Sequence, residues 1–255
     1  MCIRDRPRPG KALVYLWDEP KPDAMSQLSK LSQLVKKFAP SLKQLVTITY
    51  QPELANSIDI FVPVINHFDV PGFPSPTIYQ EFQKKGHEVW WYVSCMSHGC
   101  EALADTGVPD MVLDRSSAYV RVIGWLSMKY KIDGFLYYSV NNGYQYFPKR
   151  DPWNSLWDFS GNGDGTLFYP GRPGEHGLQD HIPIASLRLK LWRESSYDAE
   201  YINWMEKLKT KPNWWTSEFN DLVRSTTAWS RDYSNYQKLR DKIGTYLNTA
   251  EVNTI

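Results

Sequence analysis

Two adjacent carboxylates, Asp18 and Glu19, are the residues whose type and spacing most directly suggest chemistry. They follow the apolar run 12–17, which predicts a buried strand, and Pro20 restricts Glu19 to extended geometry. The pair is therefore expected at the carboxyl end of a strand, where α/β barrels carry their chemistry. In glycoside hydrolysis, one carboxyl group can protonate the leaving oxygen while a second stabilises the charge that develops on the sugar. From the spacing alone, it is an equally good interpretation that Asp18 and Glu19 are solvated loop residues before the next helix.

Strand and helix signals alternate along the chain, which predicts an α/β fold with a parallel sheet. Five strands are expected, at 12–17, 42–50, 58–64, 87–95 and 134–140. Helices are expected at 23–38 with Asp23 as cap, at 77–85, from Ser116 or Ser117 to Tyr130, at 183–208 and at 216–248. A complete (β/α)8 barrel has eight strands in about 250 residues. The chain is therefore expected to form part of a TIM-type barrel, its C-terminal strands and helices, followed by extra C-terminal helices.

The expected organisation has three parts. Residues 1–6, Met-Cys-Ile-Arg-Asp-Arg, read like the translation of a sequencing-library transposon end and are interpreted as a non-native segment. Residues 7–210 are assigned to the C-terminal part of the barrel, and residues 211–255 to a helical extension. If the true start is missing, the absence of a signal peptide carries no information about localisation.

The composition argues against nucleic acid and membrane partners and favours a carbohydrate. The 255 residues have a net charge of +1 and no long run of one sign, so neither nucleic acid nor a membrane surface is an expected partner. No segment has the apolar length of a membrane span. Aromatic residues make up 15% of the chain, including 11 Trp and 16 Tyr, and this suits a protein that stacks sugars on rings. For any single ring, packing in the core is the more common role.

No metal or cofactor is expected. Cys95, His98 and Cys100 have the side chains that zinc prefers, but no fourth ligand lies nearby in the sequence. Segment 160–165 hints at a calcium loop, yet its first position lacks the carboxylate, so a tight glycine turn is the better interpretation.

Five motifs taken together resemble the catalytic domain of glycoside hydrolase family 123, which is also catalogued as the DUF4091-type domain. They are Tyr-Leu-Trp-Asp-Glu-Pro at 15–20, Trp-Trp-Tyr at 90–92, Asp-Gly-Phe-Leu-Tyr-Tyr-Ser at 133–139, Gly-Asp-Gly-Thr-Leu-Phe-Tyr-Pro-Gly at 163–171 and Ser-Leu-Arg-Leu at 186–189. Segment 193–201 is similar to the closing helix of that domain, with Ser195 in place of a usual glycine. The resemblance covers about residues 13–208.

This resemblance implies a β-N-acetylgalactosaminidase-type enzyme that retains anomeric configuration through substrate assistance. The sugar's 2-acetamido oxygen would attack the anomeric carbon, so no protein nucleophile is needed. Asp18 matches the residue that orients the acetamido group, and Glu19 matches the general acid/base. The expected partner is a glycan or glycoconjugate, and the family suggests a secreted or periplasmic protein.

Other residues are expected to bind the sugar, although structural packing is an alternative for each. Tyr92 would bind the acetamido oxygen, Trp90 would form a pocket wall, and His67 would face the mouth of the site. Tyr138 and Asn141 would contact sugar hydroxyls, and Trp153 would stack on an acceptor sugar. Arg188, Arg193 and Asp198 are expected to form structural ion pairs. A carbohydrate-binding protein without turnover, or a glycosidase for a different sugar, remain alternatives, and the linkage and oligomeric state stay open.

Overall fold

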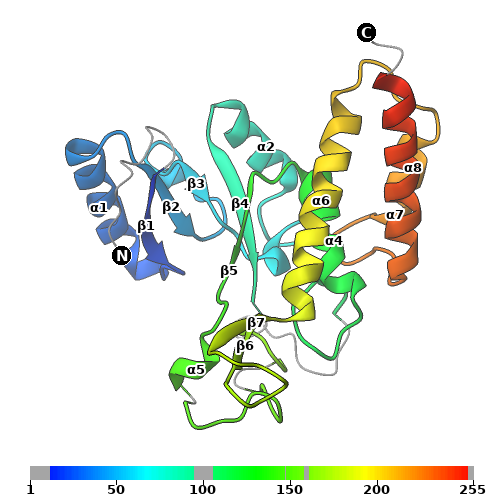
Figure 1. The fold of residues 1–255 in the computed structure, drawn as a ribbon. Helices are drawn as coiled ribbons and strands as arrows, with labels where there is room; N and C mark the ends of the chain where they lie inside the picture. Colours follow the sequence, from blue (N-terminus) through cyan, green and yellow to red (C-terminus); the bar gives the residue numbers. More distant parts are fainter. Residues whose placement is uncertain (1–11, 95–105, 147, 158–160, 252–255) are drawn as a thin grey trace. The chain divides into compact units, whose positions relative to one another are not determined.

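The computed structural model describes residues 12–94, 106–146, 148–157 and 161–251 (Figure 1). The chain divides into two compact units. The first contains residues up to Tyr92 together with 132–136, and the second contains 93–131 together with the chain from Tyr137 onward. The segments 1–6 and 95–100, on which the transposon interpretation and the zinc question depend, lie outside the described residues.

The first unit is built on a five-stranded sheet in the order in which the strands occur in the chain. Its strands are β1 (Leu13–Asp18), β2 (Lys43–Thr47), β3 (Ile60–Phe61), β4 (Glu88–Val93) and β5 (Gly134–Tyr137). The pairings from β1 to β4 are parallel, and β1 and β5 lie at the two edges of the described sheet. The predicted α/β class and parallel half-barrel are confirmed. Closure into a TIM-type barrel stays a prediction.

The two faces of this sheet bury different side chains, because successive residues of a strand point to opposite sides. One face carries the core cluster Leu45, Ile60, Val62, Val64 and Tyr92, with Trp90 and Leu136 packed against it. The other face packs against the region of α2 (Pro76–Lys84), where the Phe61 and Phe82 rings lie 5.0 Å apart.

Two predictions for the first unit are wrong in detail. β1 is not a buried strand, since the Leu13 and Tyr15 side chains are 41% and 47% exposed at the edge of the sheet. Asp23 does not cap a helix, because it lies within a 3-10 turn (Pro22–Ala24), and α1 (Met25–Phe38) begins without a side-chain cap.

The second unit is mainly helical. It contains α4 (Ala118–Tyr130), α5 (Gly143–Tyr146), α6 (Leu187–Lys207), α7 (Trp215–Leu222), α8 (Tyr233–Glu251) and an antiparallel pair formed by β6 (Phe168–Gly171) and β7 (Ile182–Ala185). No helix of the described residues is long and apolar enough to cross a membrane.

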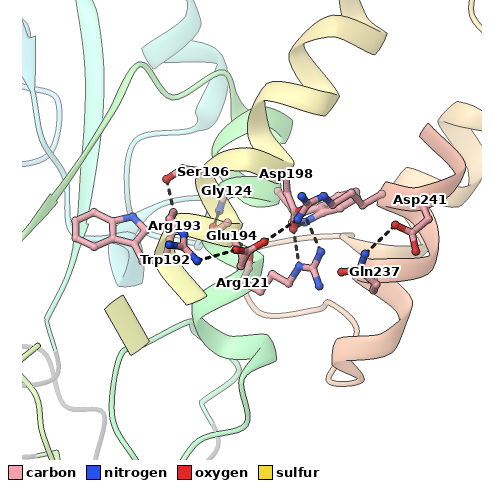
Figure 2. Close-up of polar contacts among 12 residues, drawn as sticks. Arg121, Gly124, Trp192, Arg193, Glu194, Ser196, Asp198, Gln237 and Asp241 are labelled. Carbon is pink, nitrogen blue, oxygen red and sulfur yellow. Dashed lines mark hydrogen bonds and ion pairs between the residues drawn. The ribbon is translucent and has the colours of Figure 1, made fainter. Parts of the chain in front are cut away.

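A buried charge network ties α4, α6 and α8 together (Figure 2). Arg121 donates two hydrogen bonds to Asp198, at 2.6 and 3.0 Å, and neither side chain has any exposed surface. Arg240 of α8 donates to Glu194 at 2.9 Å and lies 3.4 Å from Asp198. Asp198 therefore forms the structural ion pair that the sequence predicted. Among the described residues, Arg193 pairs with its neighbour Glu194, at 3.4 Å on the surface.

Ser195, at the position where the resemblance led us to expect glycine, has a specific structural role. Its Oγ accepts a hydrogen bond from Gly124 N at 2.7 Å and donates to Arg121 O at 3.0 Å. A Cβ atom at Gly124 would lie 2.2 Å from Ser195 O, so α4 and α6 approach too closely there for any side chain. The serine thus satisfies backbone groups at the close contact of the two helices.

Arg188 joins two of the quoted motifs, 186–189 and 163–171, in one buried cluster. It was expected in an ion pair, but it donates instead to the carbonyl oxygens of Met111 (2.7 Å), Thr166 (2.6 Å) and Gly163. Gly163 has a φ of +81°, and a Cβ there would lie 2.8 Å from the guanidinium. Segment 160–165, described from Gly161 onward, is therefore the tight glycine turn that the sequence favoured over a calcium loop, and Arg188 holds it.

Tyr137 adds a third motif, 133–139, to the same cluster. Its hydroxyl donates to Asp164 Oδ1 at 2.9 Å and accepts from Gly165 N at 2.8 Å. The segments 133–139, 163–171 and 186–189 therefore share contacts in the fold.

Two helix predictions for the second unit are also wrong. The helix expected from Pro183 begins at Leu187, because residues 182–185 pair as β7 with β6 and Ser186 caps the helix by accepting from Leu189 N. The single helix expected over 216–248 is two helices, α7 and α8. An isolated bridge between Val223 and Trp229 interrupts it. Ser117 stands at the start of α4, as expected, but its side chain makes no capping bond.

Candidate active site

A register irregularity at the end of β1 arranges the candidate site. The pairing of β1 with β2 shifts between Tyr15 and Trp17, so that Tyr15 lies opposite Leu45 and Asp18 opposite Thr47. In a regular strand, residues three apart point to opposite faces. The irregularity brings Tyr15 and Asp18 to the same side, where their side chains meet.

Asp18 is held through one of its carboxylate oxygens. Tyr15 donates a hydrogen bond to Oδ1 at 2.6 Å, and the Thr47 hydroxyl lies 2.9 Å from the same oxygen. Burial and the hydrogen bond to Asp18 raise the pKa of Tyr15 well above its usual value, although Thr47 acts in the opposite direction. Tyr15 therefore keeps its proton and acts as a donor over the physiological pH range.

Glu19 does not have the extended backbone that Pro20 led us to expect. Its φ is +44°, in the left-handed region, which costs a non-glycine residue roughly 1–2 kcal/mol. Tertiary contacts hold this conformation: Glu19 N donates to Thr47 Oγ1 at 2.8 Å, and Tyr92 donates to Glu19 Oε1. Strained backbone of this kind is often found at functional sites.

Tyr92 reaches Glu19 from β4, three strands away in the sheet. Its side chain is 6% exposed. Burial, and then the hydrogen bond to Glu19, raise the pKa of Tyr92 far above its usual value. The tyrosine is therefore a permanent hydrogen-bond donor to the carboxylate.

A cavity of about 430 Å³ lies beside the carboxylate pair. Its lining consists of Trp17, Asp18, Glu19, Lys21, Asp23, Ala24 and Gln27. This volume is within the range of small-ligand pockets. The pair was expected to share its cavity with Trp90, Tyr92 and Tyr138, and the described lining includes none of the three.

Trp90 has a structural role in this arrangement. Its indole N–H donates to Glu88 at 2.9 Å, and a Cβ at Gly134 would lie 2.4 Å from its ring. The ring therefore covers the glycine of β5. His67 stacks on Phe73, with ring centroids 4.0 Å apart and planes 11° apart.

Three of the predicted sugar-binding residues belong to the second unit. Tyr138 donates to Asn142 at 2.8 Å, and Asn141 forms an isolated bridge with Thr166. Trp153 stacks on Tyr169 with a centroid distance of 4.7 Å, and its side chain is 40% exposed. Their roles toward a substrate stay predictions.

Sequence reasoning missed Tyr15 and Thr47, the two residues that hold Asp18. Thr47 could have been found, because it is a polar residue at the carboxyl end of the neighbouring parallel strand, where such sites are built. Tyr15 had no comparable signal, because its position depends on the irregularity in β1. Within the described residues, no cluster of His, Cys, Asp and Glu side chains could hold a metal ion.

The parallel sheet places the protein in the α/β class, whose functional sites lie at the carboxyl ends of the strands, and here that end presents two carboxylates. The sequence profile described as "Glycoside hydrolase 123, catalytic domain" matches residues 6–205, and the chain belongs to this family. The predicted family is therefore confirmed.

A solved structure supports the fold. It is reported under the description "The details of glycolipid glycan hydrolysis by the structural analysis of a family 123 glycoside hydrolase from Clostridium perfringens". The two chains are 16% identical with a TM-score of 0.65, and the match covers 96% of this chain and 42% of that one. No curated protein sequence matches the chain.

Proposed function

We propose that the protein hydrolyses terminal β-N-acetylhexosaminides, with N-acetylgalactosaminides preferred, and retains anomeric configuration through substrate assistance. The observation that carries the proposal is the Asp18–Glu19 pair, fixed by three hydroxyl groups at the carboxyl end of a parallel strand in a family 123 domain. Glycolipid glycan hydrolysis by the structural neighbour supports a glycan or glycoconjugate substrate.

Asp18 is suited to orient the acetamido group. Both hydrogen bonds that it receives from the described residues end on Oδ1. Oδ2 is then the acceptor for the acetamido N–H, and the negative charge stabilises the oxazolinium-like intermediate formed by attack of the acetamido oxygen.

Glu19 is suited to act as general acid and then as general base. Because Tyr92 donates to Oε1, the proton of the acid form is carried on Oε2. From there it passes to the leaving oxygen as the glycosidic bond breaks. The carboxylate then takes a proton from the water that opens the intermediate.

The test compares 2-acetamido and 2-hydroxy aryl β-glycosides of the same sugar, using the intact protein that carries this sequence. We expect turnover of the 2-acetamido substrate only, with the β-anomer as the first product seen by NMR. Equal turnover of both substrates would exclude substrate assistance and favour a carboxylate nucleophile. Binding of the sugar without turnover would instead show a carbohydrate-binding protein.

A further inference from the structure

We infer that Thr47 is a positioning residue that fixes both members of the carboxylate pair, the side chain of Asp18 and the backbone of Glu19. This inference rests on the proposed function, since it assigns a role within that reaction. Thr47 is at the end of β2, and its side chain is almost completely buried.

The donors and acceptors around Thr47 permit one consistent arrangement. A threonine hydroxyl donates one hydrogen bond and accepts up to two. Glu19 N, at 2.8 Å, can only donate, so Thr47 Oγ1 accepts there. A carboxylate can only accept, so the hydroxyl proton of Thr47 points to Asp18 Oδ1, at 2.9 Å, and not to the more distant Trp17 O, at 3.5 Å.

Tyr15 completes the arrangement. Its hydroxyl lies 2.6 Å from Asp18 Oδ1 and 3.0 Å from Thr47 Oγ1. Its single proton is directed to the closer, charged acceptor, because charge-assisted hydrogen bonds are shorter and stronger. Asp18 Oδ1 therefore accepts from two hydroxyls, and the direction in which the carboxylate presents Oδ2 is fixed.

The contact with Glu19 has a second consequence. The left-handed backbone of Glu19 is unfavourable by itself. Among the described residues, Thr47 Oγ1 accepts the Glu19 N–H at this strained position and Tyr92 fixes the carboxylate. One hydroxyl in β2 thus couples the orientation of the acetamido-binding carboxylate to the placement of the acid.

The test uses the Thr47→Val and Thr47→Ser variants in the intact protein, with Thr49→Val as a matched control. Valine keeps the shape of threonine and removes the hydroxyl, whereas serine keeps the hydroxyl and removes a methyl group. Thr49 is two residues further along, and its hydroxyl lies 3.5 Å from the Gln51 side chain. Kinetics use an aryl β-N-acetylgalactosaminide, and thermal unfolding measures the stability of each variant.

Thr47→Val should lower kcat by about 10- to 100-fold with little change in KM, the range expected for losing a hydrogen bond to a charged group. Thr47→Ser should stay within about threefold of the wild type, as should Thr49→Val. A packing role would give the opposite order of the two Thr47 variants. Higher activity of the valine variant than of the serine variant, or a valine variant within threefold of the wild type, would overturn the inference.

Failure of the inference is distinguishable from failure of the proposed function through Asp18→Ala. If Asp18→Ala abolishes activity and Thr47→Val does not lower it, the proposed function stands and the role of Thr47 is refuted. If Asp18→Ala leaves activity unchanged, the proposed function itself is refuted, and the role of Thr47 falls with it.

Discussion

The Tyr92 hydroxyl donates a hydrogen bond to Glu19 Oε1, although 73 residues separate the two in the chain. The contact crosses the sheet from β4 to the end of β1. In the proposed reaction it leaves the acid proton on Oε2 of Glu19. A side chain that donates to the acid in this way should affect the reaction whether or not it also binds the acetamido oxygen.

Tyr92→Phe should therefore lower kcat/KM by about tenfold, because one hydrogen bond to a charged group is lost. The loss should be larger for substrates with poor leaving groups, which depend most on protonation. Steady-state kinetics with a series of aryl substrates measure both effects. Tyr79→Phe is the control: Tyr79 is also buried, and its hydroxyl accepts from Tyr50 N at 3.2 Å, away from the carboxylates.

Glu19→Gln should lose about 10²- to 10⁴-fold in kcat for poor leaving groups, the range typical of general acid catalysis. The loss should shrink as the leaving group improves, since a good leaving group departs without a proton. The measurement is the slope of log kcat against leaving-group pKa. The exposed Glu53→Gln serves as control, and an unchanged slope in Glu19→Gln would remove the acid role from Glu19.

Asp18→Asn should lose about 10²- to 10³-fold in kcat for good and poor leaving groups alike. The amide lacks the negative charge that stabilises the acetamido-derived intermediate, and this requirement does not depend on the leaving group. The same substrate series tests the prediction. A loss confined to poor leaving groups would mean that Asp18 acts in proton transfer.

Asp198→Asn should lower the free energy of unfolding by about 3–5 kcal/mol, because it leaves Arg121 buried without a compensating charge. Urea unfolding followed by circular dichroism measures the loss. Asp241, which accepts a hydrogen bond from Gln237 on the surface of α8, provides the control (Figure 2). Asp241→Asn should change stability by less than about 0.5 kcal/mol. Similar small effects of both variants would contradict a stabilising role for the buried pair.

Asp110 should make the stability of the second unit depend on pH. Burial raises the pKa of Asp110 from 3.8 to about 6, although Val112 N and Arg115 act in the opposite direction. The folded state therefore holds this proton more tightly than the unfolded state, and stability is lost as pH rises from about 4 to above 6.

Asp110→Asn removes this titration and should gain stability relative to the wild type over the same pH interval. The difference should grow by up to about 3 kcal/mol, since each pKa unit corresponds to about 1.4 kcal/mol. Urea unfolding at pH 4, 5, 6 and 7 measures it. The exposed Asp114→Asn should follow the wild-type curve. A constant difference between Asp110→Asn and the wild type would contradict the raised pKa.

Much of the fold was predictable because it depends on local patterns. Alternating apolar strands and amphipathic helices indicate the α/β class, and the helix expected at 77–85 is present as α2 (Pro76–Lys84). The boundaries that failed depended on distant pairing. Residues 182–185 form a strand because β6 lies beside them, whereas the sequence had suggested that Pro183 starts a helix.

The sequence by itself determined the chemistry available at the site: two adjacent carboxylates after a strand, in motifs specific to one family. Only the tertiary structure decided how those groups are held. An irregularity in β1 places Tyr15 beside Asp18, and Thr47 and Tyr92 from other strands fix the pair and hold Glu19 in a left-handed conformation. The residue types show which functional groups are available to react. The hydrogen bonds between distant strands form only after the sheet has brought those strands together.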